Sequence, residues 1–185
     1  LSVIRGTLEV LIRRPREEAH YHSKIQYCIG EVDRIGILID QLLILARFES
    51  SQINPNAVEI ELNQSVKYCI FRISEYAADK GIRINFEEKN KYFVCADPSL
   101  LDIILENLFT NAIKYSNESK QIDVFLNDSE NEVTCSIKDY GIGMNKEQLL
   151  RVFDRFYRSE EARSAEIGGH GIGMAIVKRL TDLQN

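Results

Sequence analysis

The sequence lacks several features that mark large classes of protein. Its 23 Lys and Arg residues form no block and are outnumbered by 28 Asp and Glu residues, which gives a formal net charge of −5. Because nucleic-acid binding needs clustered cations to neutralise phosphates, nucleic acid is not expected as the main partner. We find no signal peptide and no apolar run long enough to cross a bilayer, so any membrane attachment would lie in segments upstream of this chain.

Cysteines are few and none has the spacing of a metal site. The four are Cys28, Cys69, Cys95 and Cys135, and each lies in an apolar stretch. This pattern favours reduced thiols in a hydrophobic core over disulfides, and it weakly indicates a reducing cytoplasm.

The first fifty residues carry an apolar pattern typical of paired helices. Between residues 25 and 46 the apolar positions advance in steps of three and four, which is a heptad seam that needs a partner helix. Residues 1–14 carry a similar stripe, and Pro15 separates the two segments. Two short helices bury little alone, so we expect a hairpin that forms a dimeric four-helix bundle. The alternative is a hairpin packed on its own globular domain. The seam consists of Ile25, Cys28, Val32, Ile35, Ile39, Leu42 and Ala46.

The pattern changes near residue 52. The turn residues Asn54, Pro55 and Asn56 predict a boundary between a domain at 1–51 and a domain at 52–185. Strand and helix patterns then alternate, which predicts an α+β sandwich of helices on a sheet. The predicted strands are Val58–Leu62, Ile82–Phe86, Tyr92–Cys95, Ile122–Leu126 and Val133–Ile137, the last two antiparallel; the predicted helices are Asn63–Ala78, Asp97–Tyr115, Lys146–Val152 and Ile172–Leu183, with Asn63 and Asp97 as caps.

One face of the predicted helix Asp97–Tyr115 carries polar groups suited to an anion with a hard cation. Asn107, Asn111 and Lys114 follow one another at steps of four and three, so they share this face. Amide oxygens suit Mg²⁺, and lysine suits phosphate. Taken alone, the pattern is weak evidence, and a polar helix face in water is the favoured alternative.

Two glycine-rich segments follow. Asp139–Met144 comes directly after a predicted strand, where an acidic side chain can accept a hydrogen bond from an exocyclic amine such as that of adenine. Gly168–Gly173 leads into the last helix, and backbone N–H groups at a helix N-terminus form an anion site. Each segment alone fits an ordinary tight turn equally well.

Together these segments resemble the conserved boxes of sensor histidine kinases, in the family order and over nearly the whole chain. Residues 1–4, Leu-Ser-Val-Ile, resemble the continuation of the phosphoacceptor motif. The chain is therefore identified as a member of that family, with a HisKA-type dimerisation hairpin and an HATPase_c domain of the Bergerat α/β-sandwich fold. The matching boxes are the N box at Glu106–Ser116, the G1 box at Asp139–Met144, the F box at Phe153–Arg158 and the G2 box at Gly169–Lys178.

The resemblance implies a site for ATP and Mg²⁺. Asn111 would coordinate the metal, with Asn107 close to the metal and the phosphates. Lys114 would contact phosphate, Tyr115 would pack near the adenine, and Asp139 would accept from the adenine amine.

The resemblance also implies a flexible lid over the nucleotide, from about Asn145 to His170, anchored by Phe153 and Phe156, for which ordinary core packing is the alternative. Arg158 would contact the γ-phosphate. The glycines that would allow close backbone approach are Gly141, Gly143, Gly169, Gly171 and Gly173.

The reaction implied is transfer of the γ-phosphate to a histidine. ATP hydrolases of the superfamily place a glutamate four residues before the metal-binding Asn, and this chain has Asn107 there. An amide is a poor general base, so we expect slow hydrolysis. Glu106 is a candidate catalytic group, with a surface charge as the alternative.

The acceptor histidine is expected upstream of Leu1, so this fragment should not phosphorylate itself at the usual site. His20 and His22 are predicted to be exposed loop residues near the hairpin bend, and His170 to be a lid residue. The family also has closing strands that would follow Asn185.

The implied partners are a second copy through the hairpin and a response regulator receiver domain. The implied location is the cytoplasmic side of a bacterial inner membrane, reached through missing upstream segments. Two alternatives remain: an ATPase or serine kinase of the same superfamily, or a dimeric scaffold that binds nucleotide without catalysis.

Overall fold

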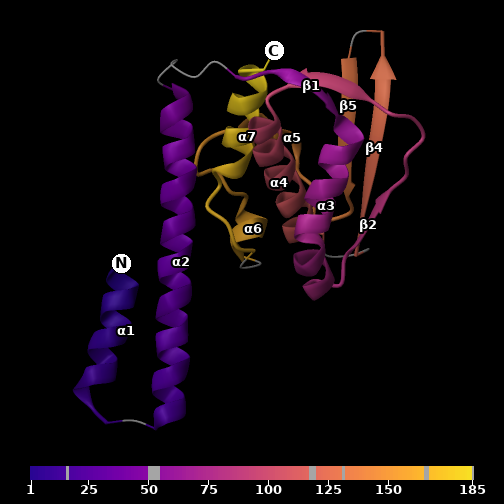
Figure 1. Ribbon diagram of the computed structural model, residues 1–185. Helices are drawn as coiled ribbons and strands as arrows, with labels where there is room; N and C mark the ends of the chain where they lie inside the picture. The colour runs from indigo at the N-terminus through magenta and orange to yellow at the C-terminus, as the bar shows by residue number, and fades with distance from the viewer. Residues whose placement is uncertain (16, 50–54, 117–119, 131, 165–166, 185) are drawn as a thin grey trace. The chain divides into compact units, whose positions relative to one another are not determined.

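The computed structural model describes residues 1–15, 17–49, 55–116, 120–130, 132–164 and 167–184 (Figure 1). The chain divides into two compact units, a hairpin unit at Leu1–Ala46 and a sandwich unit at Arg47–Asn185. The domain boundary predicted between residues 51 and 52 lies outside the described residues and stays a prediction.

The hairpin unit consists of α1 (Ser2–Arg13) and most of α2 (Glu18–Glu49), so the predicted hairpin of helices is confirmed. Tyr21 closes the bend by donating its hydroxyl to the Leu11 carbonyl oxygen at 3.3 Å. The prediction that His20 and His22 are loop residues is wrong, because α2 already begins at Glu18, whose carboxylate suits the positive end of a helix. None of the helices in the described part of the chain is both long and apolar enough to cross a membrane.

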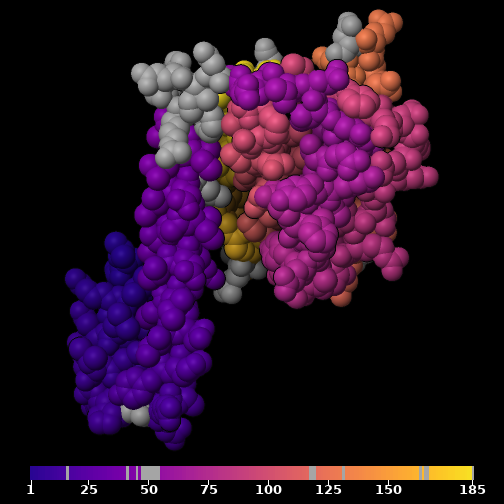
Figure 2. Space-filling view, in the orientation of Figure 1, coloured from indigo at the N-terminus to yellow at the C-terminus, as the bar shows by residue number. Residues whose placement is uncertain are grey.

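The sandwich unit places helices against two small sheets, which confirms the α+β class. A two-stranded sheet pairs β1 with β3 antiparallel. The second sheet has the order β2-β4-β5, with β2 parallel to β4 and β4 antiparallel to β5. Helix α3 forms much of the surface seen in Figure 2. The strands are β1 (Val58–Glu61), β2 (Arg83–Phe86), β3 (Phe93–Ala96), β4 (Gln121–Ser129) and β5 (Glu132–Asp139); the helices are α3 (Leu62–Asp79), α4 (Pro98–Tyr115), α5 (Lys146–Arg151), α6 (Glu160–Ser164) and α7 (Gly173–Asp182).

The core lies between the helices and one face of the three-stranded sheet. Alternate residues of β4 point into it: Ile122 and Val124 are buried, whereas Asp123 between them faces the other side. Helix α4 contributes fully buried side chains such as Phe109 and Leu105. Because α4 packs against α3 as well as α7, its polar face is fixed by contacts on two sides.

The predicted role of Asn63 as a helix cap is wrong. Helix α3 begins one residue earlier, at Leu62, and Asn63 is fully buried. Its amide accepts a hydrogen bond from the Tyr92 backbone N–H and donates to the Asn90 carbonyl oxygen, both at 2.9 Å. Asn63 therefore joins α3 to the segment that leads into β3, a tertiary contact that outweighs its local preference for a cap.

All four cysteines are free thiols, as predicted, but their burial differs. Cys28 and Cys69 are buried and Cys135 is partly buried. Cys95 is exposed, so the prediction of a core thiol is wrong there. Strand β3 alternates Val94 and Cys95 between its two faces, which the continuous apolar sequence does not reveal.

The predicted cap at the start of α4 is confirmed. One carboxylate oxygen of Asp97 accepts from the N–H groups of Ser99 at 2.9 Å and Leu100 at 3.3 Å, and the other accepts from the Asn56 N–H at 2.9 Å. We expect Asp97→Ala to lower the free energy of unfolding by about 1–2 kcal/mol, because three backbone donors lose their acceptor. Chemical denaturation measures this change.

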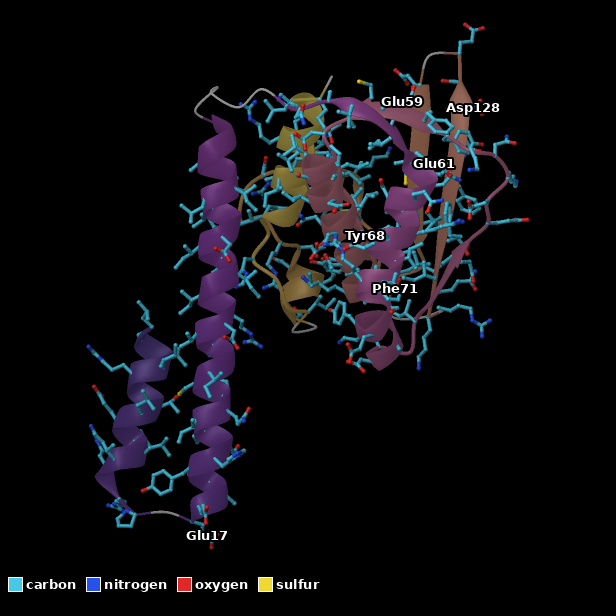
Figure 3. The ribbon with its side chains drawn as sticks, in the orientation of Figure 1. Glu17, Glu59, Glu61, Tyr68, Phe71 and Asp128 are labelled. Carbon is cyan, nitrogen blue, oxygen red and sulfur yellow. The ribbon has the colours of Figure 1, made fainter. Side chains whose placement is uncertain are left out.

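The matched control is Asp128→Ala, at an exposed position of β4 (Figure 3). It removes a carboxylate outside any helix cap and should leave the denaturation midpoint nearly unchanged. Equal effects of the two substitutions would show that the cap contributes nothing specific.

Candidate functional site

The polar face of α4 meets the first residue of α7. A Cβ built on Gly173 would lie 2.7 Å from the Asn107 side-chain oxygen and 3.7 Å from the Asn111 side-chain nitrogen. A Cβ at this position would force the Asn107 side chain to shift, so glycine allows the two helices to approach as they do. The two amides of α4 and the N-terminal backbone of α7 therefore face the same space, although they lie far apart in sequence.

The amide of Asn107 is oriented by its own helix. Its nitrogen donates to the Ile103 carbonyl at 2.8 Å, which leaves the oxygen turned toward Gly173. Amide oxygens of this kind fit a hard divalent cation that keeps most of its water ligands. The described residues contain no group of three or more His, Cys, Asp or Glu side chains placed to hold a metal ion.

Two cationic side chains, Lys114 and Arg158, lie near the C-terminal end of α4. The Lys114 ammonium is 3.9 Å from where a Cβ on Gly169 would lie. Burial, and then the charge of Arg158, lower the pKa of Lys114. Arg158 in turn donates from Nη2 to the carbonyl oxygens of Ala162 and Ile167. Its buried Nε has no partner within the described residues. Two neighbouring cations and a buried, unpaired N–H group form a site suited to an anion.

The turn after β5 packs on the end of α4. A Cβ on Gly141 would lie only 1.7 Å from the carbonyl oxygen of Tyr115, so the backbone of the turn touches the helix directly. Asp139 holds the same turn, because its Oδ1 accepts from the Gly141 N–H at 3.0 Å. We expected the Gly141 backbone to lie close to a ligand, and in the structure it lies close to the backbone of Tyr115. Gly143 has a left-handed φ of 66° and open space around it.

The segment between the turn after β5 and the glycine segment before α7 contains two helices. Helix α5 begins with a capping box formed by Asn145 and Gln148, and the short helix α6 was not predicted. Phe153 and Phe156 are 43% and 55% exposed, so the core alternative for them is wrong. The backbone of Phe156 contacts the second glycine segment, because its N–H donates to the Gly171 carbonyl at 2.8 Å, and its φ is 62°. A role of the two phenylalanines as lid anchors stays a prediction.

Glu106 lies next to Asn107 in sequence but contacts a different element. Its carboxylate pairs with Arg72 of α3 at 3.1 Å, and that guanidinium also stacks 5.2 Å from the centre of the Tyr68 ring. A catalytic role for Glu106 stays a prediction.

The structure groups the predicted site residues into three contacts. Asn107 and Asn111 lie against Gly173. Lys114 lies near Gly169, and the charge of Arg158 lowers its pKa. Tyr115 contacts Gly141 beside Asp139. Sequence reasoning missed the carbonyls of Ala162 and Ile167 and the tertiary role of Gly141, because backbone groups leave no signal in residue identity.

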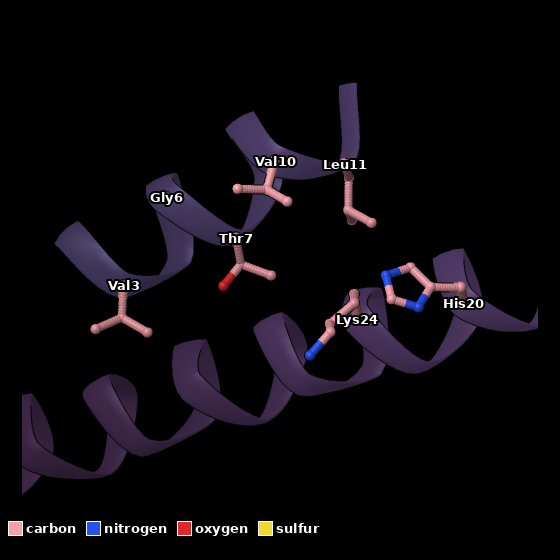
Figure 4. A pocket seen from close by; sticks show the side chains of 7 residues that line it. All are labelled: Val3, Gly6, Thr7, Val10, Leu11, His20 and Lys24. Atoms are coloured by element: carbon pink, nitrogen blue, oxygen red, sulfur yellow. The ribbon is translucent and has the colours of Figure 1, made fainter. Parts of the chain in front are cut away.

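The hairpin unit contains a hollow between α1 and α2. It has a volume of about 360 Å³ and is lined by residues of both helices, among them Leu11, His20 and Lys24 (Figure 4). Beyond the bend the predicted seam stays open, since Ile25 and Val32 are 46% and 55% exposed. The single chain therefore leaves part of the heptad seam exposed, although Cys28 within it is buried.

Comparison with known proteins gives a consistent result. Residues 96–185 match the family described as histidine kinase-, DNA gyrase B-, and HSP90-like ATPase. The chain is 32% identical over 184 residues to the sensor protein CiaH of Streptococcus pneumoniae, which covers 98% of this chain and 41% of that protein. The chain thus spans well under half the length of this curated relative.

Solved structures share the fold. Full-length ShkA in complex with AMPPNP matches with a TM-score of 0.76 and 22% identity, over 98% of this chain and 38% of that one. Histidine kinase ThkA in complex with the response regulator protein TrrA matches with a TM-score of 0.72 and 21% identity, over 85% of this chain and 46% of that one.

Proposed function

We propose that this chain is the catalytic core of a sensor histidine kinase, because residues 96–185 match the histidine kinase-, DNA gyrase B-, and HSP90-like ATPase family and the chain is similar to a sensor protein over nearly its whole length. It binds Mg²⁺ and ATP and transfers the γ-phosphate to a histidine of the dimerisation hairpin, from which a response regulator aspartate takes it.

One observation carries this proposal: the amide-and-lysine face of α4 meets both glycine segments. The adenine end is the turn of Asp139 and Gly141, where a carboxylate accepts from the exocyclic amine. The phosphate end is the space shared by Lys114, Arg158 and the start of α7, where cations and helix N–H groups suit phosphate oxygens. Gly143, Gly169 and Gly171 give the backbone its close approach.

The residues present fit a magnesium ion. In this proposal Asn111 and Asn107 supply amide oxygens, and the remaining positions are filled by water and the phosphates. The bound ion would neutralise charge on the phosphates.

The chemical step is an in-line transfer. A histidine nitrogen forms the new bond to the γ-phosphorus while the bond to the β,γ-bridging oxygen breaks, and ADP leaves with that oxygen. Asn107 stands where a water-activating glutamate would be needed for hydrolysis, so transfer to water stays slow.

The hairpin unit supports the proposed partners. The exposed residues of its seam, Ile25, Val32 and Ile39 at 46%, 55% and 52% exposure, fit a second copy and a four-helix bundle. The complex of ThkA with TrrA supports a receiver domain as the second partner. We place the core on the cytoplasmic side of a bacterial inner membrane.

The test uses the full-length parent protein with radiolabelled ATP and Mg²⁺. We expect label on the protein that is lost in acid and kept in base, as for phosphohistidine, and transfer of that label to a receiver domain. Release of free phosphate without protein label would support an ATPase instead. Nucleotide binding with neither product would support a scaffold.

A further inference from the structure

The three-stranded sheet carries a row of polar side chains on the face turned away from the core. Asn85 of β2, Asp123 of β4 and Lys138 of β5 are direct neighbours across the three strands. Asp123 lies between two buried residues of β4, so its side chain is on the outer face. Asp139 pairs with the buried Ile122 and therefore points to the helix side.

Tyr140, the residue after Asp139, belongs to this outer row. Its hydroxyl donates to Oδ2 of Asp123 at 2.7 Å. The other oxygen, Oδ1, accepts from the amides of Asn85 at 2.8 Å and Gln121 at 2.7 Å. The Lys138 ammonium lies 4.7 Å from the centre of the Tyr140 ring.

The network fixes the Asp123 carboxylate in place. Hydrogen bonds from Asn85, Tyr140 and Gln121, in that order, lower the pKa of Asp123, and Lys138 adds a smaller effect. The carboxylate is therefore a charged acceptor held from two strands, and a hydrogen bond to a charged acceptor is stronger than one between neutral groups.

We propose that Tyr140 is a positioning residue, whose bond to Asp123 on the outer face holds the turn so that the Asp139 carboxylate is set for the adenine amine. The inference rests on the proposed function. The turn is held from two sides: Gly141 touches the Tyr115 carbonyl on the helix side, and Tyr140 is tied to Asp123 on the other. Asp139 lies between these two attachments.

Tyr140→Phe tests the bond and keeps the ring and its contact with Lys138. We expect ATP to bind roughly three- to tenfold more weakly, since one hydrogen bond to a charged group is lost. The preference for ATP over GTP should fall, because guanine has a carbonyl oxygen at C6, where adenine has the amine that donates to Asp139. The melting temperature should change little. The control is Tyr68→Phe on α3, an exposed tyrosine whose ring projects from that helix (Figure 3).

A second variant separates positioning from a general loss of structure. Asp123→Ala and Tyr140→Phe break the same hydrogen bond, so their effects on ATP affinity should not add. The double variant should bind ATP about as tightly as whichever single variant has the lower ATP affinity. In the Tyr140→Phe variant, an NMR titration should also show a higher Asp123 pKa, with Asn85, Gln121 and Lys138 still facing the carboxylate.

The outcomes are distinct. Unchanged ATP affinity and unchanged ATP-over-GTP preference in Tyr140→Phe would overturn the inference while leaving the kinase assignment intact. Effects of the two substitutions that simply add would overturn it too. Failure of the unmodified protein to bind adenine nucleotide would overturn the proposed function, and this inference with it.

Discussion

Asp139→Asn is expected to weaken adenine nucleotide binding roughly 10- to 150-fold, because a hydrogen bond to a charged group is worth about 1.5–3 kcal/mol and each 1.4 kcal/mol is a factor of ten. The substitution is close to isosteric. The amide oxygen can still accept from the Gly141 N–H, as Oδ1 of Asp139 does at 3.0 Å. The other atom becomes an NH₂ donor and opposes the adenine amine.

Calorimetric titration with ATP and Mg²⁺ measures the change, and thermal unfolding of each variant verifies that the fold is kept. Asp128→Asn is the control, since it removes the same charge at an exposed position of β4. If Asp139→Asn bound ATP as tightly as the parent, the adenine site would have to lie elsewhere.

The second large effect is expected from Gly141→Ala. The added methyl carbon would lie 1.7 Å from the Tyr115 carbonyl oxygen, which belongs to a helix end that cannot rotate away as a side chain could. The turn must shift and carry Asp139 with it. We expect a loss of about 1–3 kcal/mol of stability, the usual range for overpacking, together with loss of measurable nucleotide binding.

Gly36→Ala in α2 is the matched control, because a Cβ there meets no atom within 4 Å and the residue lies outside the candidate site. It should not lower the denaturation midpoint and should bind ATP normally. Denaturation curves and nucleotide titrations of both variants decide the matter. A Gly141→Ala protein that matched the parent in both measurements would show that the turn is not fixed by its contact with α4.

Much of the fold was predictable where local signals agree. The start of α4 combines a capping aspartate with proline in the first turn, and the structure has the helix there. The hairpin of β4 and β5 followed from alternation, although both strands extend further toward the turn than predicted. The parallel pairing of β2 with β4 had no local signal, because it joins strands that are distant in sequence.

The errors at Asn63 and Cys95 share one physical cause, which is that tertiary contacts override local preference. Asn63 has the residue type of a cap but is buried to hold Tyr92 and Asn90. Cys95 lies in an apolar run yet faces outward, because β3 is covered on one side. The shared face of Asn107, Asn111 and Lys114 was predictable from spacing, and the other proposed site residues came from the family resemblance. The attachment of Tyr140 to Asp123 depends on which strands become neighbours.

The contact of Gly173 with Asn107 has a consequence for how the protein is made. The ribosome releases the α4 segment well before the residues of α7, and domains fold as their chain emerges. Until α7 has left the exit tunnel, the face of α4 that carries Asn107 has no helix packed against it at Gly173. A nascent chain that stops before Gly173 therefore lacks the contact between α4 and α7.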